Sequence, residues 1–313
     1  MNTYLLIDGN AIMHRAYHAI PPFKTKDGTP TNVIFGFFSM LHKAITDFKP
    51  DYLIVCFDVK GPTFRKKLFE EYKAQRKKID DDLLIQIPFV KEGLKEAHII
   101  YAEKQGFEAD DLLGTISKKL SNAENKILIL SGDKDILQLA NDHVFIVTPP
   151  IGFAKMKIYN KEEVLNKFGV SPEQMADFKA LAGDQADNYS GAKGIGPKTA
   201  SSLIQQFGTL ENILANIDKV SSEKLQTILK ENNENILMGK KLSQIDSNVE
   251  IDLDYEKTKF RYFHQDFKNF LLKFEMYSLI NRFFNQKKEI KKIEKTPDLQ
   301  KKVENQIDQI KLF

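Results

Sequence analysis

Short apolar runs alternate with stretches of helical periodicity through the first 150 residues of the chain. Runs bounded by turn residues indicate buried strands, whereas apolar residues spaced three or four positions apart indicate helices. The pattern predicts strands at 5–9, 53–58, 98–101, 127–133 and 144–147, and helices at 33–48 and 110–120. Buried strands separated by helices predict an α/β fold, with a mainly parallel central sheet covered by helices on both faces.

The pattern becomes mainly helical after Pro149 and Pro150. Short helices joined by Gly or Asn turns are predicted at 162–168, 172–181, 199–207 and 210–217, and helical patterns continue from 221 to 242. We expect a short edge strand at 249–253, an aromatic-rich pair of core helices at 263–284 and a flexible charged tail from 286. The chain is therefore divided into an α/β domain at 1–170, a helical region at 171–285 and a tail at 286–313.

The composition is that of a globular protein. The chain has 313 residues, of which 42% are hydrophobic, and this can fill one large core or two modest ones. No apolar run approaches the roughly 18 residues that a membrane span needs, and Asp8 interrupts the first run too early for a signal peptide. The single cysteine, Cys56, lies inside an apolar run and is expected to be a reduced core residue. We therefore expect a cytoplasmic protein without a membrane partner.

Carboxylates gather where predicted strands end and where one predicted helix begins. Asp8, Asp58 and Asp133 each end a strand, and ligands of parallel sheets bind outside these carboxyl ends. Any one of these acids could instead cap a helix or favour its N-terminal dipole, so a structural role stays open. Convergence of several would demand a cation. The full set of candidates for one crevice is Asp8, Asp58, Glu108, Asp110, Asp111, Asp133, Asp135, Asp184 and Asp187.

The net charge is only +3, but basic residues cluster at 65–78, directly after the second acidic strand, and again at 287–302. The first cluster fits a solvated helix stabilised by i,i+4 charge pairs. It equally fits a phosphate-binding segment over the acidic crevice, with interleaved aromatic residues for base or sugar contacts. The segment alone does not decide between the two interpretations.

A glycine-rich stretch at 191–200 resembles a nucleotide-binding loop only superficially. In a Walker loop the second glycine is followed directly by lysine, whereas Pro197 here separates Gly196 from Lys198, and no predicted strand precedes the stretch. A tight glycine hairpin between two helices would instead present backbone amides to a phosphodiester, with Lys193 and Lys198 adding charge. Such a hairpin predicts DNA binding that is independent of sequence.

Seven blocks of sequence lie in one order between about residues 4 and 200. They are Leu-Ile-Asp-Gly-Asn at 6–10, Phe-Asp at 57–58 with Phe-Arg at 64–65, Glu-Tyr-Lys-Ala-Gln-Arg at 71–76, Phe-Glu-Ala-Asp-Asp at 107–111, Ser-Gly-Asp-Lys-Asp at 131–135, Gly-Asp-Gln-Ala-Asp-Asn at 183–188 and Gly-Ala-Lys-Gly-Ile-Gly at 191–196. Together they resemble the bacterial 5'-3' exonuclease and flap endonuclease family, to which the N-terminal nuclease domain of DNA polymerase I belongs.

The resemblance implies a PIN-like nuclease core, a helical arch over the active site at about 64–88 and a helix-hairpin-helix DNA clamp at about 183–207. It implies cleavage of DNA that carries a 5' flap or a free 5' end, as in RNA primer and flap removal during replication and repair. Family members also hold K⁺ in the hairpin, and we expect a stand-alone, monomeric, nucleoid-associated bacterial enzyme. The residues that the resemblance assigns to DNA binding are Arg65, Tyr72, Lys77, Gly191, Lys193, Gly194, Gly196, Lys198 and Thr199.

Nine carboxylate side chains, in a sequence with nothing that resembles a Cys/His zinc site, suit two Mg²⁺ or Mn²⁺ ions, because these hard cations prefer oxygen ligands. We assign the first ion to Asp8, Asp58, Glu108, Asp110 and Asp111, and the second to Asp133, Asp135, Asp184 and Asp187. Lys73 and Arg76 on the arch would add positive charge in the transition state. Two other functions stay open: recognition of DNA flaps without cleavage, and a nuclease that works only within a polymerase.

The chain ends in Gln-Ile-Lys-Leu-Phe at 309–313, an apolar and aromatic end to the charged tail. The segment is either a frayed end or a docking peptide for a groove on another protein. It resembles the bacterial sliding-clamp binding pentapeptide and keeps the residues Gln309, Leu312 and Phe313. The resemblance therefore predicts the sliding clamp as a partner.

Overall fold

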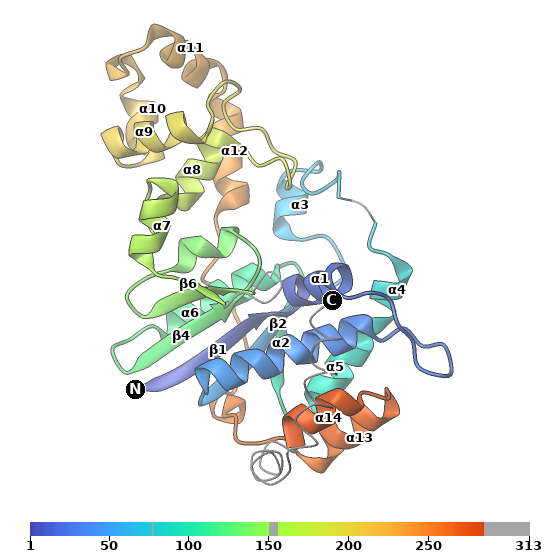
Figure 1. Cartoon of the computed structure of the whole chain (residues 1–313). Helices are drawn as coiled ribbons and strands as arrows, with labels where there is room; N and C mark the ends of the chain where they lie inside the picture. The colour runs from blue at the N-terminus through green and yellow to red at the C-terminus, as the bar shows by residue number, and fades with distance from the viewer. Residues whose placement is uncertain (77, 150–155, 285–313) are drawn as a thin grey trace, which may run out of the picture.

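The computed structural model describes residues 1–76, 78–149 and 156–284, and Figure 1 shows a domain built on a sheet with a helical lobe above it. The sheet has six strands in the order β3-β2-β1-β4-β5-β6. Neighbouring strands are parallel except for the last pair, β5 and β6. The strands are β1 Asn2–Asp8, β2 Tyr52–Phe57, β3 Ile100–Glu103, β4 Asn125–Leu130, β5 Val144–Thr148 and β6 Lys157–Tyr159. The mainly parallel sheet is thus confirmed.

Two predictions about strands were incomplete or wrong. The three-residue strand β6 was missed because so short a segment, with two exposed residues, shows no usable periodicity. Residues 249–253 form no strand. The Val249 amide donates to the Thr115 hydroxyl at 3.0 Å instead of to a neighbouring strand.

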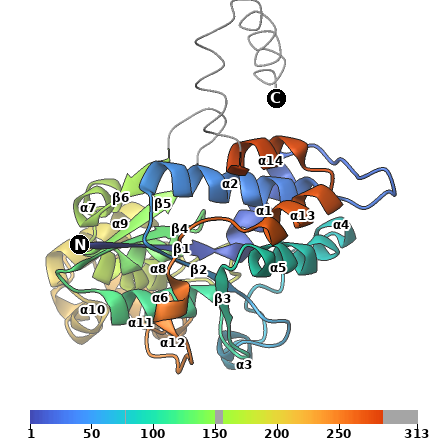
Figure 2. The same ribbon diagram turned by 90° about the horizontal axis from the view of Figure 1, so that it is seen from below.

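Helices cover both faces of the sheet, as predicted, because alternate residues of each central strand point to opposite sides. In β1, Leu5 and Ile7 enter one apolar core, and Tyr4 and Leu6 enter the other. Figure 2 shows α2, α13 and α14 on one side of the sheet and α6 on the other. The helices of the first core are α1 Gly9–Ala19, α2 Asn32–Phe48, α5 Gln86–Glu96, α13 Gln265–Lys273 and α14 Tyr277–Phe284, and the second core contains α6 Ala109–Leu120 and α7 Lys161–Phe168.

The helical lobe begins after the sheet and leads back to it. Its helices are η2 Pro172–Gln174, α8 Met175–Ala182, α9 Pro197–Phe207, α10 Leu210–Ala215, η3 Ile217–Lys219, α11 Glu223–Glu231 and α12 Asn233–Ser243. After α12 the chain returns to the sheet domain through η4 Tyr255–Thr258, and the Phe267 and Phe270 rings pack against Phe38 of α2. The region predicted as one helical unit at 171–285 is therefore split between the lobe and the sheet domain.

The segment predicted as a helical arch is only partly helical. It contains α3 Phe64–Leu68 and α4 Asp81–Leu84, with turns over 69–76. Lys73 has a left-handed backbone with φ of 55°, and its amide donates to the Asp187 carbonyl at 3.0 Å, so it cannot continue a helix. The interpretation of 65–78 as one continuous solvated helix is thus wrong. In Figure 1, α3 lies near the loop that connects α8 to α9, whereas α4 lies at the sheet domain.

Among residues 1–76, 78–149 and 156–284, no helix is both long enough and apolar enough to span a membrane.

Candidate active site

The ends of three neighbouring strands bring carboxylates to one edge of the sheet. Asp8 is the last residue of β1 and is 3% exposed. One of its oxygens accepts the Ala11 amide at 2.9 Å, and the other accepts the Ser131 hydroxyl, beyond β4, at 2.7 Å. Asp8 therefore has the structural role of capping α1, and its second oxygen reaches the residue that follows β4. Ser131 itself was not among the predicted site residues.

The start of α6 closes this edge. Asp58, just beyond β2, accepts the Ala109 amide at 2.7 Å, which ties the strand end to the first turn of α6. Asp110 lies in that first turn, and Asp8 and Asp133 are among the charges that act on it. Asp133 accepts the Asp135 amide at 2.9 Å. Asp8 thus lies within electrostatic range of Asp58, Asp110 and Asp133.

The negative charge at this edge is not fully compensated. Burial, followed by the neighbouring charges of Asp58 and Asp133, raises the pKa of Asp8 to about 7. Burial and the charges of Asp8 and Asp133 raise the pKa of Asp110 well above its ordinary value. Burial, opposed by Lys179 but reinforced by Asp133, raises the pKa of Asp135 to about 6. A cation would favour the charged form of these carboxyl groups, because it would offset both their burial and the repulsion from the neighbouring acids.

The donor set fits hard divalent cations, because it consists of carboxylate oxygens. In the described ranges, however, no three His, Cys, Asp or Glu side chains are already arranged as a metal cage. Several of the carboxylates form ion pairs with basic side chains instead. A divalent cation would therefore have to draw these oxygens together and release some of their present partners.

The segment after α3 supplies two of these basic side chains. Lys73 Nζ lies 2.8 Å from Glu108 Oε2, and Arg76 Nη2 lies 2.6 Å from Asp187 Oδ1. The Tyr72 hydroxyl donates to Asp187 Oδ2 at 3.1 Å and also lies 3.3 Å from Glu108. The turn at 71–76 therefore joins the acids of α6 to those that follow α8.

Lys179 is a third basic residue at the crevice, and the sequence analysis missed it. It lies in the last turn of α8, donates to Asp184 Oδ2 at 2.6 Å and pairs with Asp135. Burial alone would raise the pKa of Asp184, but Lys179 and two backbone amides hold it below its usual value. The available signal was its position five residues before Asp184, on the helix that leads into the acidic turn.

Arg65 and Asp111 do not lie where the sequence analysis placed them. Arg65 is 2% exposed and Asp111 is fully buried, and their side chains form two hydrogen bonds of 2.8 and 2.7 Å. Arg65 also donates to the carbonyls of Leu242 and Gln244, and Asp111 accepts the Asp246 amide. The Arg65 guanidinium is thus not presented to DNA, and both Asp111 oxygens already have protein donors.

Tyr72 is also buried, with 3% exposure, and faces the acids instead of solvent, so it differs from a surface DNA contact. The predicted hairpin connects α8 to α9, where Gly194 has a φ of 105° that favours glycine. Lys193, Gly194, Gly196 and Lys198 are exposed there, Thr199 is half-buried and Gly191 is buried. Lys77, Gln309, Leu312 and Phe313 lie outside the described residues.

Gly191 is buried because two backbone segments cross at the base of the hairpin. A Cβ atom at this position would lie 2.4 Å from the Leu181 carbonyl and 2.5 Å from the Gly183 amide. Only glycine allows this approach, which fixes the hairpin against the end of α8.

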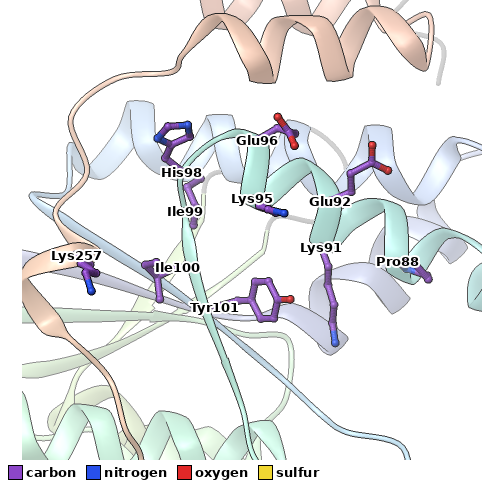
Figure 3. Close-up of a pocket in the computed structure, with 10 residues that line it drawn as sticks. All are labelled: Pro88, Lys91, Glu92, Lys95, Glu96, His98, Ile99, Ile100, Tyr101 and Lys257. Carbon is purple, nitrogen blue, oxygen red and sulfur yellow. The ribbon is translucent and has the colours of Figure 1, made fainter.

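A cavity of about 950 Å³ lies away from these acids, between α5 and the edge strand β3. Figure 3 shows the Tyr101 ring and the Lys91 side chain next to each other, with Lys257 on the other side of β3. Lys91 is paired with Glu103 and lies 5.5 Å from the centre of the Tyr101 ring. None of the described residues that line the cavity is a predicted site residue, so the cavity does not mark the acidic crevice.

Two solved structures share this fold. The T5 D15 protein co-crystallized with metal ions matches with a TM-score of 0.64 and 20% identity, covering 79% of this chain and 90% of that chain. The catalytic core of Rad2 in complex with DNA substrate matches with a TM-score of 0.60 and 18% identity, covering 91% and 92%. The chain therefore shares its fold with these two proteins.

The sequence comparisons identify the family. Residues 3–169 match the 5'-3' exonuclease N-terminal resolvase-like domain, and residues 170–266 match the 5'-3' exonuclease C-terminal SAM fold. A 5'-3' exonuclease of Aquifex aeolicus is 38% identical over 261 residues, which cover 83% of this chain and 88% of that protein. The chain belongs to the 5'-3' exonuclease family.

DNA polymerase I of Bacillus caldotenax is 39% identical over 252 residues, covering 80% of this chain but only 29% of the polymerase. The chain thus corresponds to less than a third of that protein. The resemblance to the 5'-3' exonuclease family, stated from the sequence blocks, is confirmed.

Proposed function

We propose that the chain hydrolyses phosphodiester bonds in DNA that carries a 5' flap or a free 5' end, with two divalent cations, Mg²⁺ or Mn²⁺, at the acidic crevice. The observation that carries the proposal is the gathering of the carboxyl groups of Asp8, Asp110 and Asp133 at one edge of the sheet, where they act on one another electrostatically. RNA primer and flap removal in replication and repair would use this reaction. A DNA-binding protein without cleavage would have no need to bury so many mutually repelling acids.

The residues proposed to hold the cations are revised from the sequence assignment. Asp111 is left out, because both its oxygens are bonded to Arg65. The remaining ligands are Asp8, Asp58, Glu108 and Asp110 for the first ion, and Asp133, Asp135, Asp184 and Asp187 for the second. When bound, the ions lower the pKa of an attacking water and offset charge on the phosphate.

The basic side chains at the crevice have a complementary role. Lys73 and Arg76 pair with Glu108 and Asp187 in the metal-free structure. Both would donate to a phosphate once those acids have another cation. The exposed hairpin residues Lys193 and Lys198 would hold the duplex through its backbone, and K⁺ bound by hairpin carbonyls would add to this contact.

Cleavage of 5'-labelled flap, nicked and single-stranded substrates tests the function. We expect cleavage of the flap substrate with Mg²⁺ and its loss in excess EDTA. Activity that persists in excess EDTA would contradict the metal mechanism. Flap binding without any cleavage, in Mg²⁺ and in Mn²⁺, would support a recognition protein instead.

Divalent cations should bind more tightly as the pH rises through about 6 to 7. Below these values Asp135 and Asp8 hold protons in the metal-free protein, so a cation must displace them. Titration calorimetry at pH 6 in two buffers of different ionisation enthalpy should show proton release, and the release should fall at pH 8. Equal proton release at both pH values would contradict the assignment.

The same shifts affect stability without metal. A carboxyl group whose pKa is raised by folding binds more protons in the folded state than in the unfolded state. The metal-free protein should therefore lose stability as the pH rises from about 4, the unfolded value, through about 7 for Asp8. Urea unfolding at pH 5 and pH 8 in EDTA, with saturating Mg²⁺ as the comparison, measures this loss.

The C-terminal residues 309–313 are proposed to bind a bacterial sliding clamp. Their deletion should abolish clamp binding in a pull-down and leave cleavage of free flap DNA unchanged. Clamp affinity that survives the deletion would remove this partner from the proposal.

A further inference from the structure

Lys179 already places a positive charge between two of the acids proposed for the second cation. Its ammonium group contacts Asp184 at 2.6 Å and also pairs with Asp135, and its side chain is 12% exposed. Asp135 follows β4 and Asp184 follows α8, so the ammonium group links the sheet domain to the helical lobe. The Lys179 ammonium group neutralises the two carboxylates, as a metal ion at the same point would.

A divalent cation and the Lys179 ammonium group compete for these oxygens. A carboxylate can bind the divalent cation and the ammonium group together only if the two positive charges lie within a few ångströms of each other. Their repulsion at that distance is large in a partly buried site. The ammonium group, on a flexible four-carbon side chain, is the partner that can move. Binding of an ion to Asp135 and Asp184 therefore requires another acceptor for Lys179.

Tyr189 offers that acceptor. Across the residues that the structure describes, its hydroxyl is the one buried side-chain nitrogen or oxygen without a hydrogen-bond partner, and the residue is 6% exposed. Its backbone pairs with Asp184 through two hydrogen bonds of 2.9 and 3.1 Å. Lys179, Asp135 and Asp184 all act electrostatically on the hydroxyl. An unpartnered buried hydroxyl costs stability in this state of the protein. Such a group needs an explanation, and a hydrogen bond formed in another state of the protein provides one.

We infer that Lys179 is a displaceable internal counter-ion, which holds Asp135 and Asp184 until a second divalent cation binds and then moves to the Tyr189 hydroxyl. The inference rests on the proposed function, since it concerns the same crevice. Lys179 is a positioning residue here, because it acts through the carboxylates. The consequence is that the second cation binds more weakly than the first, even though it has four acidic neighbours.

Removal of the ammonium group should strengthen binding of the second cation. Free Mn²⁺ measured by electron paramagnetic resonance counts bound ions in the full chain without DNA. Lys179→Met should bind the weaker Mn²⁺ ion about tenfold more tightly than the wild type, because one nearby like charge is gone. Lys179→Gln carries the same expectation, so the test does not depend on one variant folding.

Lys240→Met is the matched control. Lys240 also joins two acids of the helical lobe, Asp177 at 2.7 Å and Glu211 at 2.5 Å, but neither is a proposed ligand. This variant should leave both Mn²⁺ affinities at their wild-type values. An equal gain in both lysine variants would show a general charge effect and would overturn the inference.

A double-mutant cycle tests the Tyr189 contact. Tyr189→Phe should weaken binding of the second Mn²⁺ ion in the wild-type background, because the displaced Lys179 ammonium group loses its acceptor. The same substitution should have no effect beside Lys179→Met. An effect of equal size in both backgrounds would overturn the proposed movement.

The outcome separates this inference from the function. If the wild type cleaves flap DNA with Mn²⁺ but neither neutral Lys179 variant binds the second ion more tightly, Lys179 is an ordinary structural ion pair and the inference fails alone. If the wild type binds no divalent ion, the proposed metal chemistry fails together with it.

Discussion

Replacing Asp110 or Asp133 with asparagine is expected to lower metal-dependent cleavage of a 5'-flap substrate by orders of magnitude while DNA binding stays measurable. Both side chains lie in the group of acids that repel one another at the carboxyl edge of the sheet. Asparagine keeps the shape and one oxygen but removes the charge that would hold a cation. Initial cleavage rates with Mg²⁺, and fluorescence anisotropy of labelled flap DNA in EDTA, measure the two properties.

Asp142→Asn is the matched control, because Asp142 is exposed and precedes β5 at the opposite end of the strands. We expect wild-type cleavage from this variant. We also expect Asp110→Asn to unfold at no lower temperature than the wild type, since it removes a half-buried carboxyl group whose pKa is raised by loss of solvent and by the neighbouring acids. Wild-type cleavage by Asp110→Asn and Asp133→Asn would contradict the site.

Arg65→Ala is expected to destabilise the protein by about 3–5 kcal/mol, the usual cost of removing one partner of a buried ion pair. Arg65 is 2% exposed and makes bonds of 2.7 to 2.9 Å with Asp111, Leu242 and Gln244. The substitution leaves the Asp111 carboxylate buried without its counter-ion and two carbonyls without a donor. Urea unfolding in EDTA measures the loss without a contribution from metal binding.

The neighbouring Lys67→Ala provides the comparison, because Lys67 lies on the same short helix but is exposed. Its effect should stay within about 0.5 kcal/mol, as for most surface substitutions. The double variant Arg65→Ala, Asp111→Asn should cost less than the sum of its single variants, since each one alone removes the same pair. A loss below about 1 kcal/mol for Arg65→Ala would show that the pair contributes little.

The arrangement of the arch segment follows from these contacts. Arg65 attaches the first turn of this segment to Asp111 of α6 and to the C-terminal end of α12, through the Leu242 and Gln244 carbonyls. The Lys73 amide attaches the middle of the segment to the Asp187 carbonyl. Residues from three distant parts of the chain thus fix one segment beside the acids. This explains why the basic cluster at 65–78 is neither a free helix nor simply a DNA-facing surface.

Much of the fold could be predicted because its signals are local. The strand runs are apolar because both faces of the sheet are covered, and the period of α2 and α6 follows from the one face that each helix buries. Acids at strand ends could be placed at one edge because parallel strands end together. The same reasoning identified Asp8, Asp58, Asp110 and Asp133 as neighbours without any knowledge of distances.

The charge partners could not be predicted in this way. Arg65 meets Asp111 across 46 positions, Arg76 meets Asp187 across 111, and Lys179 meets Asp135 across 44. A side chain of one sign has many possible partners in the sequence, and only packing decides which of them lies within reach. Local pattern also cannot show whether a basic segment is exposed, so Arg65 and Tyr72 were expected at the surface and are buried.

The sequence by itself determined the sheet, the edge at which its acids gather, and the family through its ordered blocks. Only the tertiary structure decided which acids remain uncompensated, which are neutralised by Lys73, Arg76 and Lys179, and which one, Asp111, serves the fold. The physical reason is that periodicity and burial are properties of a segment, whereas the balance of charge in a crevice depends on every segment that meets there.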